Sequence, residues 1–138
     1  RWAVRRGRTL PLRGEVPRGQ EAEAAVSRPA RGEVWLTDLN PTRGHEQAGR
    51  RPTLVVSEDL FNRGPAGLVI VLPMTSRVRG IPSHVPVDPP EGGVDHRTAI
   101  LCEAVRSISV ERLAVRWGAV ERSTMEAVED RLRILLRL

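Results

Sequence analysis

Arginine and hydroxyl side chains beside two apolar segments are the residues best suited to chemistry in this sequence. Arg51 opens the segment RPTLVVS, and Thr75 and Ser76 follow the apolar run LVIVLPM. A guanidinium offers five N–H donors in a planar fork that matches phosphate oxygens, and each hydroxyl can donate one more hydrogen bond. Such a set could hold a phosphodiester and stabilise the added charge of a pentacoordinate transition state. The alternative is a structural Arg–Glu pair with hydroxyls that only stabilise a turn.

A long polar loop, residues 39–49, separates the two strands that must position Arg51. Residues 33–39 alternate apolar and polar side chains, and residues 51–57 form a second apolar segment that Pro52 opens. Residues 75–82 form another polar loop after the buried run. Because rigid strands commonly present binding residues on loops, we expect these two loops to meet and form the site.

The remaining pattern predicts a mainly β fold, closed by a helix at the C-terminus. Further strands are expected at 68–72, at 84–87, at 98–102 with a continuation toward Val105 and Ile108, and at 115–120. Pro86 places the 84–87 strand at an edge. Short helical turns are expected at 60–62 and 110–113. Together these elements predict a small barrel of mostly antiparallel sheet.

The final helix is expected to begin at Ser123, which has the Ser-x-x-Glu spacing of a capping box with Glu126. An apolar stripe at helical spacing predicts that this helix packs on the core; its members are Met125, Val128, Leu132 and Leu135. Three more apolar residues near its end suggest a subunit interface; they are Ile134, Leu136 and Leu138.

The positive charge of the chain lies entirely in its first part. Residues 1–31 hold eight arginines and three glutamates, whereas residues 32–138 hold 14 arginines and 14 carboxylates. Residues 1–30 show no helical or strand period, so we expect a basic, mobile arm before a single domain at 31–138. The pattern of a secretory signal is absent from this arm. Because residue 1 is not methionine, we expect a fragment, a processed product or an over-long start assignment.

Metal and thiol chemistry are not indicated. The three histidines are scattered without metal-ligand spacing and are expected on the surface or in loops, so no metal and no cofactor are predicted. The lone cysteine, Cys102, is expected to be a small buried hydrophobe, compatible with a reducing cytoplasm. No apolar run is long enough to span a membrane.

Three sequence motifs point to a family. The first comprises RGEVW at 31–35, DLNP at 38–41, GHEQ at 44–47 and GRRP at 49–52. The second is an apolar strand that ends in PMTS at 73–76, and the third is an apolar strand followed by EAVRSI at 103–108. With these motifs in register across residues 31–138, the sequence resembles the MazF/PemK family of endoribonuclease toxins of type II toxin–antitoxin systems.

The resemblance implies an SH3-like barrel, shared with the gyrase-poison toxin CcdB, that works as a homodimer. It implies metal-independent cleavage of single-stranded RNA at short sequences. In that reaction the 2′-OH attacks the adjacent phosphate, leaving a cyclic phosphate and a 5′-OH. The family's catalytic arginine and threonine correspond to Arg51 and Thr75. Because arginine is a poor general base, Arg51 is expected chiefly to stabilise transition-state charge.

The same resemblance suggests which residues bind RNA. Base and phosphate contacts are expected from Arg43, Glu46, Gln47, Arg50, Ser76 and Arg77. Ala104 stands where several family members have a base-contacting glutamine, so their cleavage sequence cannot be carried over.

A cognate antitoxin is the other expected partner, with an extended, often acidic tail that fills the RNA groove. Two alternatives remain at this point. One is a non-catalytic CcdB-like poison that binds a topoisomerase through its C-terminal helix. The other is an antitoxin-binding dimer with a decayed catalytic site.

Overall fold

The computed structural model describes residues 29–41 and 43–138. Apart from its last two residues, the basic arm predicted at 1–30 therefore lies outside the described residues and stays a prediction. In the described part of the chain, no helix is long and apolar enough to cross a membrane.

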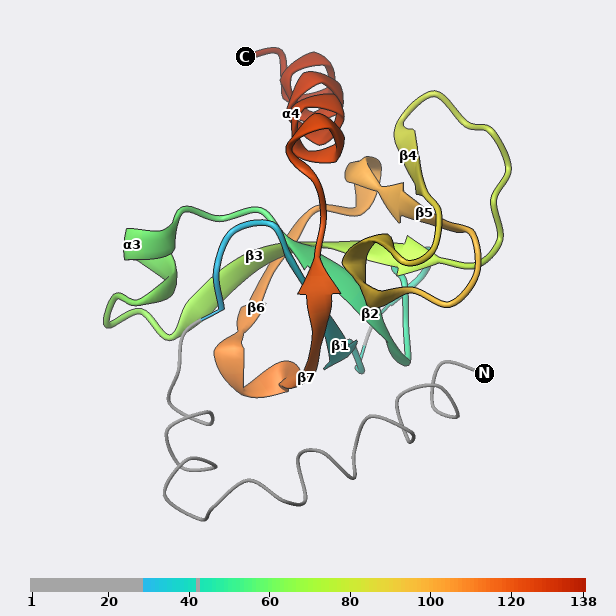
Figure 1. Cartoon of the computed structure of the whole chain (residues 1–138). Coiled ribbons are helices and arrows are strands. Elements are labelled where there is room, and N and C mark those ends of the chain that lie inside the picture. The colour runs from blue at the N-terminus through green and yellow to red at the C-terminus, as the bar shows by residue number, and fades with distance from the viewer. Residues whose placement is uncertain (1–28, 42) are drawn as a thin grey trace.

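Seven strands, two helices and three 3₁₀ turns make up the described chain (Figure 1). The strands are β1 (Glu33–Asp38), β2 (Arg50–Val55), β3 (Leu68–Thr75), β4 (His84–Val87), β5 (Thr98–Leu101), β6 (Arg106–Ser109) and β7 (Leu113–Ala119). The helices are α3 (Asp59–Asn62) and α4 (Arg122–Leu136), and the 3₁₀ turns are η1 (Glu91–Gly93), η2 (Cys102–Ala104) and η3 (Val110–Arg112).

The strands form one antiparallel sheet in the order β4-β5-β3-β2-β1-β7, with β6 also paired to β3. This confirms the mainly β fold with a C-terminal helix. The edge position predicted for β4 is also confirmed, since β4 ends the sheet path. Within the described residues no pairing joins β4 to β7, so the sheet is open and does not close into the barrel predicted from the sequence.

The predicted continuation of β5 toward Val105 and Ile108 is wrong in one respect: the strand is interrupted by the turn η2, and β6 begins after it. β5 and β6 lie along the same edge of β3, opposite β2, with Ile100 facing Met74 and Arg106 facing Val71. The chain advances six residues from Ile100 to Arg106, whereas the facing part of β3 advances only three, from Met74 to Val71. The three extra residues form the turn η2. The apolar pattern runs through this bulge, so it could not reveal the interruption.

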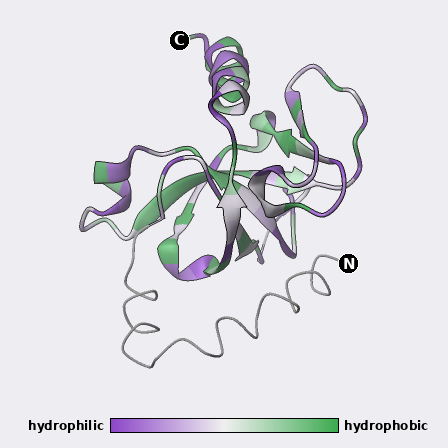
Figure 2. Cartoon of the chain, viewed as in Figure 1, coloured by the Kyte–Doolittle hydropathy of each residue, from purple (hydrophilic) through white to green (hydrophobic). Residues whose placement is uncertain are grey.

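The core lies between the curved sheet and α4. Its larger cluster includes Val34, Leu54, Leu72 and Ile100, all without exposed surface. Figure 2 shows the hydrophobic colour along much of β3, the strand that pairs with β2, β5 and β6. Cys102 is fully buried in this cluster, as predicted, and burial together with the nearby charge of Glu103 raises the pKa of its thiol to about 11.

The predicted capping box of the last helix is wrong. α4 begins at Arg122, one residue earlier than expected, and Glu121 at its N-cap makes no side-chain cap hydrogen bond. Instead, the Glu91 carboxylate from η1 accepts the Glu121 backbone N–H at 2.9 Å and the Thr124 hydroxyl. A carboxylate at a helix N-terminus also complements the helix dipole, so this distant residue supplies the cap.

The apolar stripe of α4 packs on the core over its first three turns only. Val128 is fully buried, and Met125 and Leu132 pack against the core cluster. The fourth member, Leu135, is 44% exposed, so its predicted core packing is wrong in this chain. The last turn leaves three further apolar side chains exposed, namely Ile134, Leu136 and Leu138.

Candidate active site

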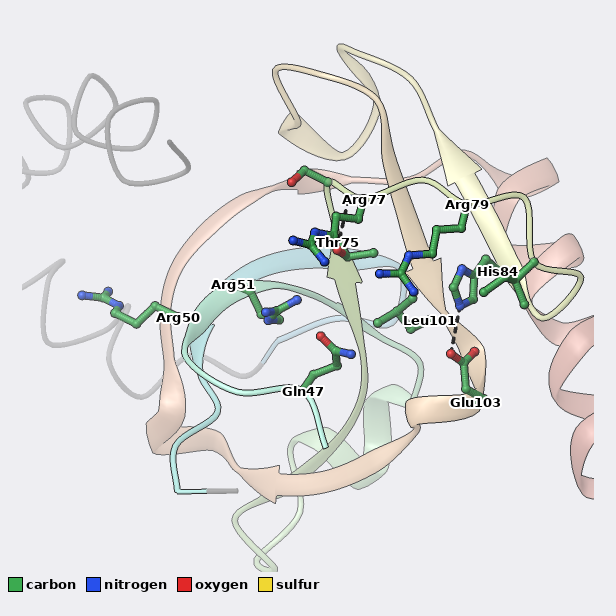
Figure 3. A pocket seen from close by; sticks show the side chains of 11 residues that line it. Gln47, Arg50, Arg51, Thr75, Arg77, Arg79, His84, Leu101 and Glu103 are labelled. Atoms are coloured by element: carbon green, nitrogen blue, oxygen red, sulfur yellow. Dashed lines mark hydrogen bonds and ion pairs between the residues drawn. The ribbon is translucent and has the colours of Figure 1, made fainter. Parts of the chain in front are cut away.

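The start of β2 and the end of β3 bring Arg51 and Thr75 together. Thr53 faces Pro73 in the antiparallel ladder. Two residues further along each strand, on the same face of the sheet, the ladder leads to Arg51 and Thr75. Both side chains line one pocket of ≈ 470 Å³ (Figure 3). The prediction that the two polar segments meet is therefore confirmed in geometry.

The Arg51 guanidinium is fixed by the backbone on both sides of the pocket. Its Nε donates to the carbonyl oxygen of Ala48 at 3.0 Å, and its Nη1 donates to that of Met74 at 3.3 Å. Of its five N–H donors, these bonds use two, and about three remain for a ligand. Burial lowers the pKa of this half-buried arginine from its ordinary value. The Arg51 guanidinium is thus held in place at the pocket, with N–H donors left for a ligand.

Thr75 is set by a short local turn. Its hydroxyl oxygen accepts the backbone N–H of Arg77 at 3.1 Å. A hydroxyl that accepts in this way keeps its own hydrogen for donation. The half-buried Thr75 can therefore donate to an anionic oxygen in the pocket.

Four of the six predicted RNA-binding residues line the same pocket as Arg51 and Thr75; they are Gln47, Arg50, Ser76 and Arg77. Figure 3 shows Gln47 directed toward Arg51, whereas Arg50 is directed away from it. Arg50 also lines a neighbouring pocket on the β7 side, with Asp38 and Arg112. It is therefore placed to extend the groove rather than to act at its centre.

The other two predicted RNA-binding residues lie on the 39–49 loop beyond this pocket. Glu46 lines an adjoining pocket of ≈ 360 Å³. Arg43 is exposed outside both pockets, and its backbone N–H donates to the Glu46 carboxylate at 2.6 Å. The structure thus brings Glu46 to the groove and leaves Arg43 on the loop surface.

Sequence reasoning missed five residues that line the main pocket: Arg79, Ile81, His84, Leu101 and Glu103. His84 lies in β4, the strand predicted at 84–87, but its expected exposure on the surface is wrong, because it is only 9% exposed. Its Nε2 lies 2.9 Å from Glu103 Oε2. The third motif drew attention to Glu103, but nothing in the local sequence around either residue indicated that His84 would contact it.

Two pockets form one groove because Gln47 and Glu103 line both of them. Ala104 lines the second pocket. The main pocket carries four arginine side chains, Arg50, Arg51, Arg77 and Arg79, and Glu103 is its one carboxylate in the described residues. This balance favours a polyanion such as a nucleic-acid backbone.

Metal-ligand residues do not gather anywhere in residues 29–41 and 43–138. There, no group of three or more His, Cys, Asp or Glu could hold an ion. The side chains that line the main pocket offer arginine, hydroxyl, amide, imidazole and carboxylate groups.

Comparison with known proteins decides the family. A family model described as PemK-like, MazF-like toxin of type II toxin-antitoxin system matches residues 30–136. The chain belongs to this toxin family. The resemblance predicted from its three motifs is thus confirmed, and the arginine–threonine groove is the groove of a MazF-like toxin.

Individual relatives agree with the family match. The chain is 34% identical over 109 residues to Endoribonuclease EndoA of Bacillus subtilis (strain 168), which covers 78% of this chain and 94% of that protein. A solved structure of MazF from Deinococcus radiodurans superimposes with a TM-score of 0.73 at 32% identity, covering 81% of this chain and 99% of that one. A MazE–MazF structure from the same organism gives a TM-score of 0.64 at 30% identity, covering 80% and 96%.

Proposed function

We propose that this MazF-like toxin is an endoribonuclease that cleaves single-stranded RNA in the groove between the 39–49 loop and the end of β3. The observation that carries the proposal is the convergence of Arg51 and Thr75 on one arginine-rich pocket. The family match and the name of the Bacillus subtilis relative, an endoribonuclease, support it.

The proposed reaction is an internal transesterification. The ribose 2′-oxygen forms a bond to the adjacent phosphorus, and the bond from phosphorus to the 5′-oxygen of the next nucleotide breaks. The 2′-OH loses a proton and the leaving 5′-oxygen gains one, so the products are a 2′,3′-cyclic phosphate and a 5′-OH. No water and no metal ion enter the equation for this step.

Arg51 and Thr75 are the catalytic residues in this proposal. Negative charge on the phosphoryl oxygens grows as the 2′-oxygen approaches, and groups fixed beforehand stabilise such charge most effectively. The two backbone carbonyls that hold Arg51 supply this fixation. The Thr75 hydroxyl donates to the same phosphate, and its orientation is restricted by the bond it accepts from Arg77.

The surrounding groove would bind the RNA strand on either side of the cut. Arg50, Arg77 and the exposed loop residue Arg43 are assigned to backbone phosphates, where arginine forks fit oxygen pairs. Ser76 adds a hydroxyl near the scissile phosphate. Glu46 and Gln47 are assigned to base edges, since single-stranded RNA presents unstacked bases to a protein.

The proposed partners follow from the same groove and from α4. An antitoxin with an acidic segment would compete with RNA for the four arginines of the main pocket. A second copy of the chain would cover the exposed apolar end of α4, and the protein would work as a homodimer in the cytoplasm.

The test is incubation of a long single-stranded RNA with the purified chain in EDTA, beside Arg51→Ala and Thr75→Ala, with the cut ends mapped. The proposal predicts cleavage by the wild type at a short recurring sequence and its loss in both variants. A folded wild type that leaves every RNA intact would instead favour a non-catalytic poison or a decayed, antitoxin-binding dimer. Binding to a topoisomerase would then separate those two alternatives.

A further inference from the structure

Glu103 owes its place in the groove to the bulge between β5 and β6. The three residues of η2, Cys102–Ala104, are the surplus that the register of the two strands along β3 requires. Cys102 turns into the core, whereas Glu103 and Ala104 line the groove. The bulge therefore places a carboxylate where the two pockets meet.

This carboxylate is held by the side chains of Ser83, which lies just before β4, and of His84, the first residue of β4. The Ser83 hydroxyl donates to Oε1 at 2.8 Å, and the His84 Nε2 lies at hydrogen-bonding distance, 2.9 Å, from Oε2. The His84 ring is buried within the fold, so it cannot swing away freely. The Glu103 side chain nevertheless remains 44% exposed, and Figure 3 shows it across the pocket from Gln47. Glu103 is both fixed and accessible.

The held carboxylate stays ionised and can only accept hydrogen bonds. Burial alone would raise the pKa of Glu103, but the hydrogen bonds from His84, the backbone and Ser83 outweigh it, and the net shift is downward. A carboxylate repels phosphate, so among the arginines of this groove it is unsuited to the RNA backbone. It is suited to a ligand group that donates hydrogen bonds, and in RNA such groups lie on base edges.

We infer that Glu103 reads a guanine base beside the scissile phosphate, an inference that rests on the proposed function. Each anchored oxygen still has a lone pair, and the Watson–Crick edge of guanine presents two neighbouring donors, N1–H and the 2-amino group. Adenine and cytosine present one amino group, and uracil presents one N–H between two carbonyl oxygens that a carboxylate repels.

The second pocket has the remaining features of a base site. Pro73 and Val105 supply apolar surface for a base. Arg106 lines the same pocket, and its buried Nη1 has no hydrogen-bond partner in the described part of the chain. A small shift of this guanidinium toward the guanine O6 would satisfy both groups. Ala104 lines the same pocket with a side chain that offers no hydrogen bond, so Glu103 is the polar group that η2 presents there.

The first experiment maps cleavage ends in an RNA pool with random sequence, for the wild type and for Glu103→Gln. The matched control is Glu126→Gln, which removes the same charge from an exposed site on α4. A good bidentate contact to a base gives about tenfold to hundredfold discrimination. We expect a guanine preference of that size at one position beside the cut for the wild type and the control, and its loss in Glu103→Gln.

The second experiment measures binding without cleavage. The oligonucleotides carry 2′-deoxyribose at the scissile position and either guanosine or inosine at the selected position. Binding is followed by fluorescence anisotropy. Inosine lacks only the 2-amino group, so the wild type should bind it about tenfold more weakly, as for one lost pairing contact. Glu103→Ala, which removes both acceptor oxygens, should bind the two oligonucleotides equally, and Ser83→Ala should fall between.

The outcomes separate this inference from the proposed function. Cleavage by the wild type without a guanine preference, or a guanine–inosine difference that survives in Glu103→Ala, would overturn the role of Glu103 and leave the nuclease in place. A wild type that neither cleaves nor binds RNA would overturn both.

Discussion

Replacing Arg51 by alanine should abolish most RNA cleavage while leaving the protein folded. Arg51 uses two of its donors on the carbonyls of Ala48 and Met74, which leaves about three for the phosphate. Losing one fixed donor for a transition-state anion typically costs about 10²–10³ in rate, or about 3–4 kcal/mol. Because Arg51 supplies several, we expect Arg51→Ala to lose at least that much.

The same change should cost little stability. Two hydrogen bonds contribute about 0.5–1.5 kcal/mol each, so the free energy of unfolding should fall by about 1–3 kcal/mol. The assay is single-turnover cleavage of a fluorophore–quencher oligoribonucleotide, with urea unfolding measured on the same preparations. Arg51→Lys keeps the charge but has one compact donor group. It cannot span both carbonyls and a phosphate, so its activity should lie between that of wild type and alanine.

The matched control is Arg122→Ala, which removes a side chain that is 91% exposed at the start of α4. It should cleave at the wild-type rate. The reasoning is refuted if folded Arg51→Ala cleaves as fast as this control. It is also refuted if the loss of rate follows the loss of folded protein.

Three further predictions test other parts of the structure. Thr75→Ala should slow cleavage by roughly tenfold to hundredfold, the value of a hydrogen bond to a charged group, whereas Thr75→Ser should keep most activity; the same cleavage assay measures both. Glu91→Ala removes the acceptor of the Glu121 N–H and the Thr124 hydroxyl. It should lower the free energy of unfolding by about 1–2 kcal/mol in urea titrations without changing the cleavage rate of folded protein. Burial raises the pKa of Cys102 from 9.0 to about 11, so its contribution to stability is complete below pH 9.0 and is lost as the pH rises toward about 11. A thiol reagent at about pH 8 should therefore label Cys102 only in unfolded protein, and rapid labelling of the folded protein would contradict its burial.

The strands and the central pair of site residues were predictable from local sequence. Alternation predicted β1, the continuous apolar run predicted β3, and the proline predicted that β4 lies at an edge. Arg51 and Thr75 stood out because polar residues at strand ends are where sheets present chemistry. Their approach was an expectation, since the register of β2 on β3 is set by tertiary pairing rather than by either strand alone.

The features that were missed all depend on contacts between distant segments. The helix cap comes from Glu91, 30 residues before the Glu121 N–H that it accepts. The contact between His84 and Glu103 spans 19 residues and two strands. The bulge that holds Glu103 is visible only when β5 and β6 are both aligned on β3. Local patterns contain no information about such pairings, so neither the helix cap nor the contacts of Ser83 and His84 with Glu103 could be predicted.

The central claim is that this groove cuts RNA by attack of the ribose 2′-oxygen. The most direct measurement compares two oligonucleotides of the mapped target sequence in EDTA, one all-ribose and one with a single 2′-deoxyribose on the 5′ side of the cut. The mechanism predicts that only the all-ribose strand is cut and that its 5′ fragment ends in a 2′,3′-cyclic phosphate. Cleavage of the deoxy-substituted strand at the same bond would contradict it.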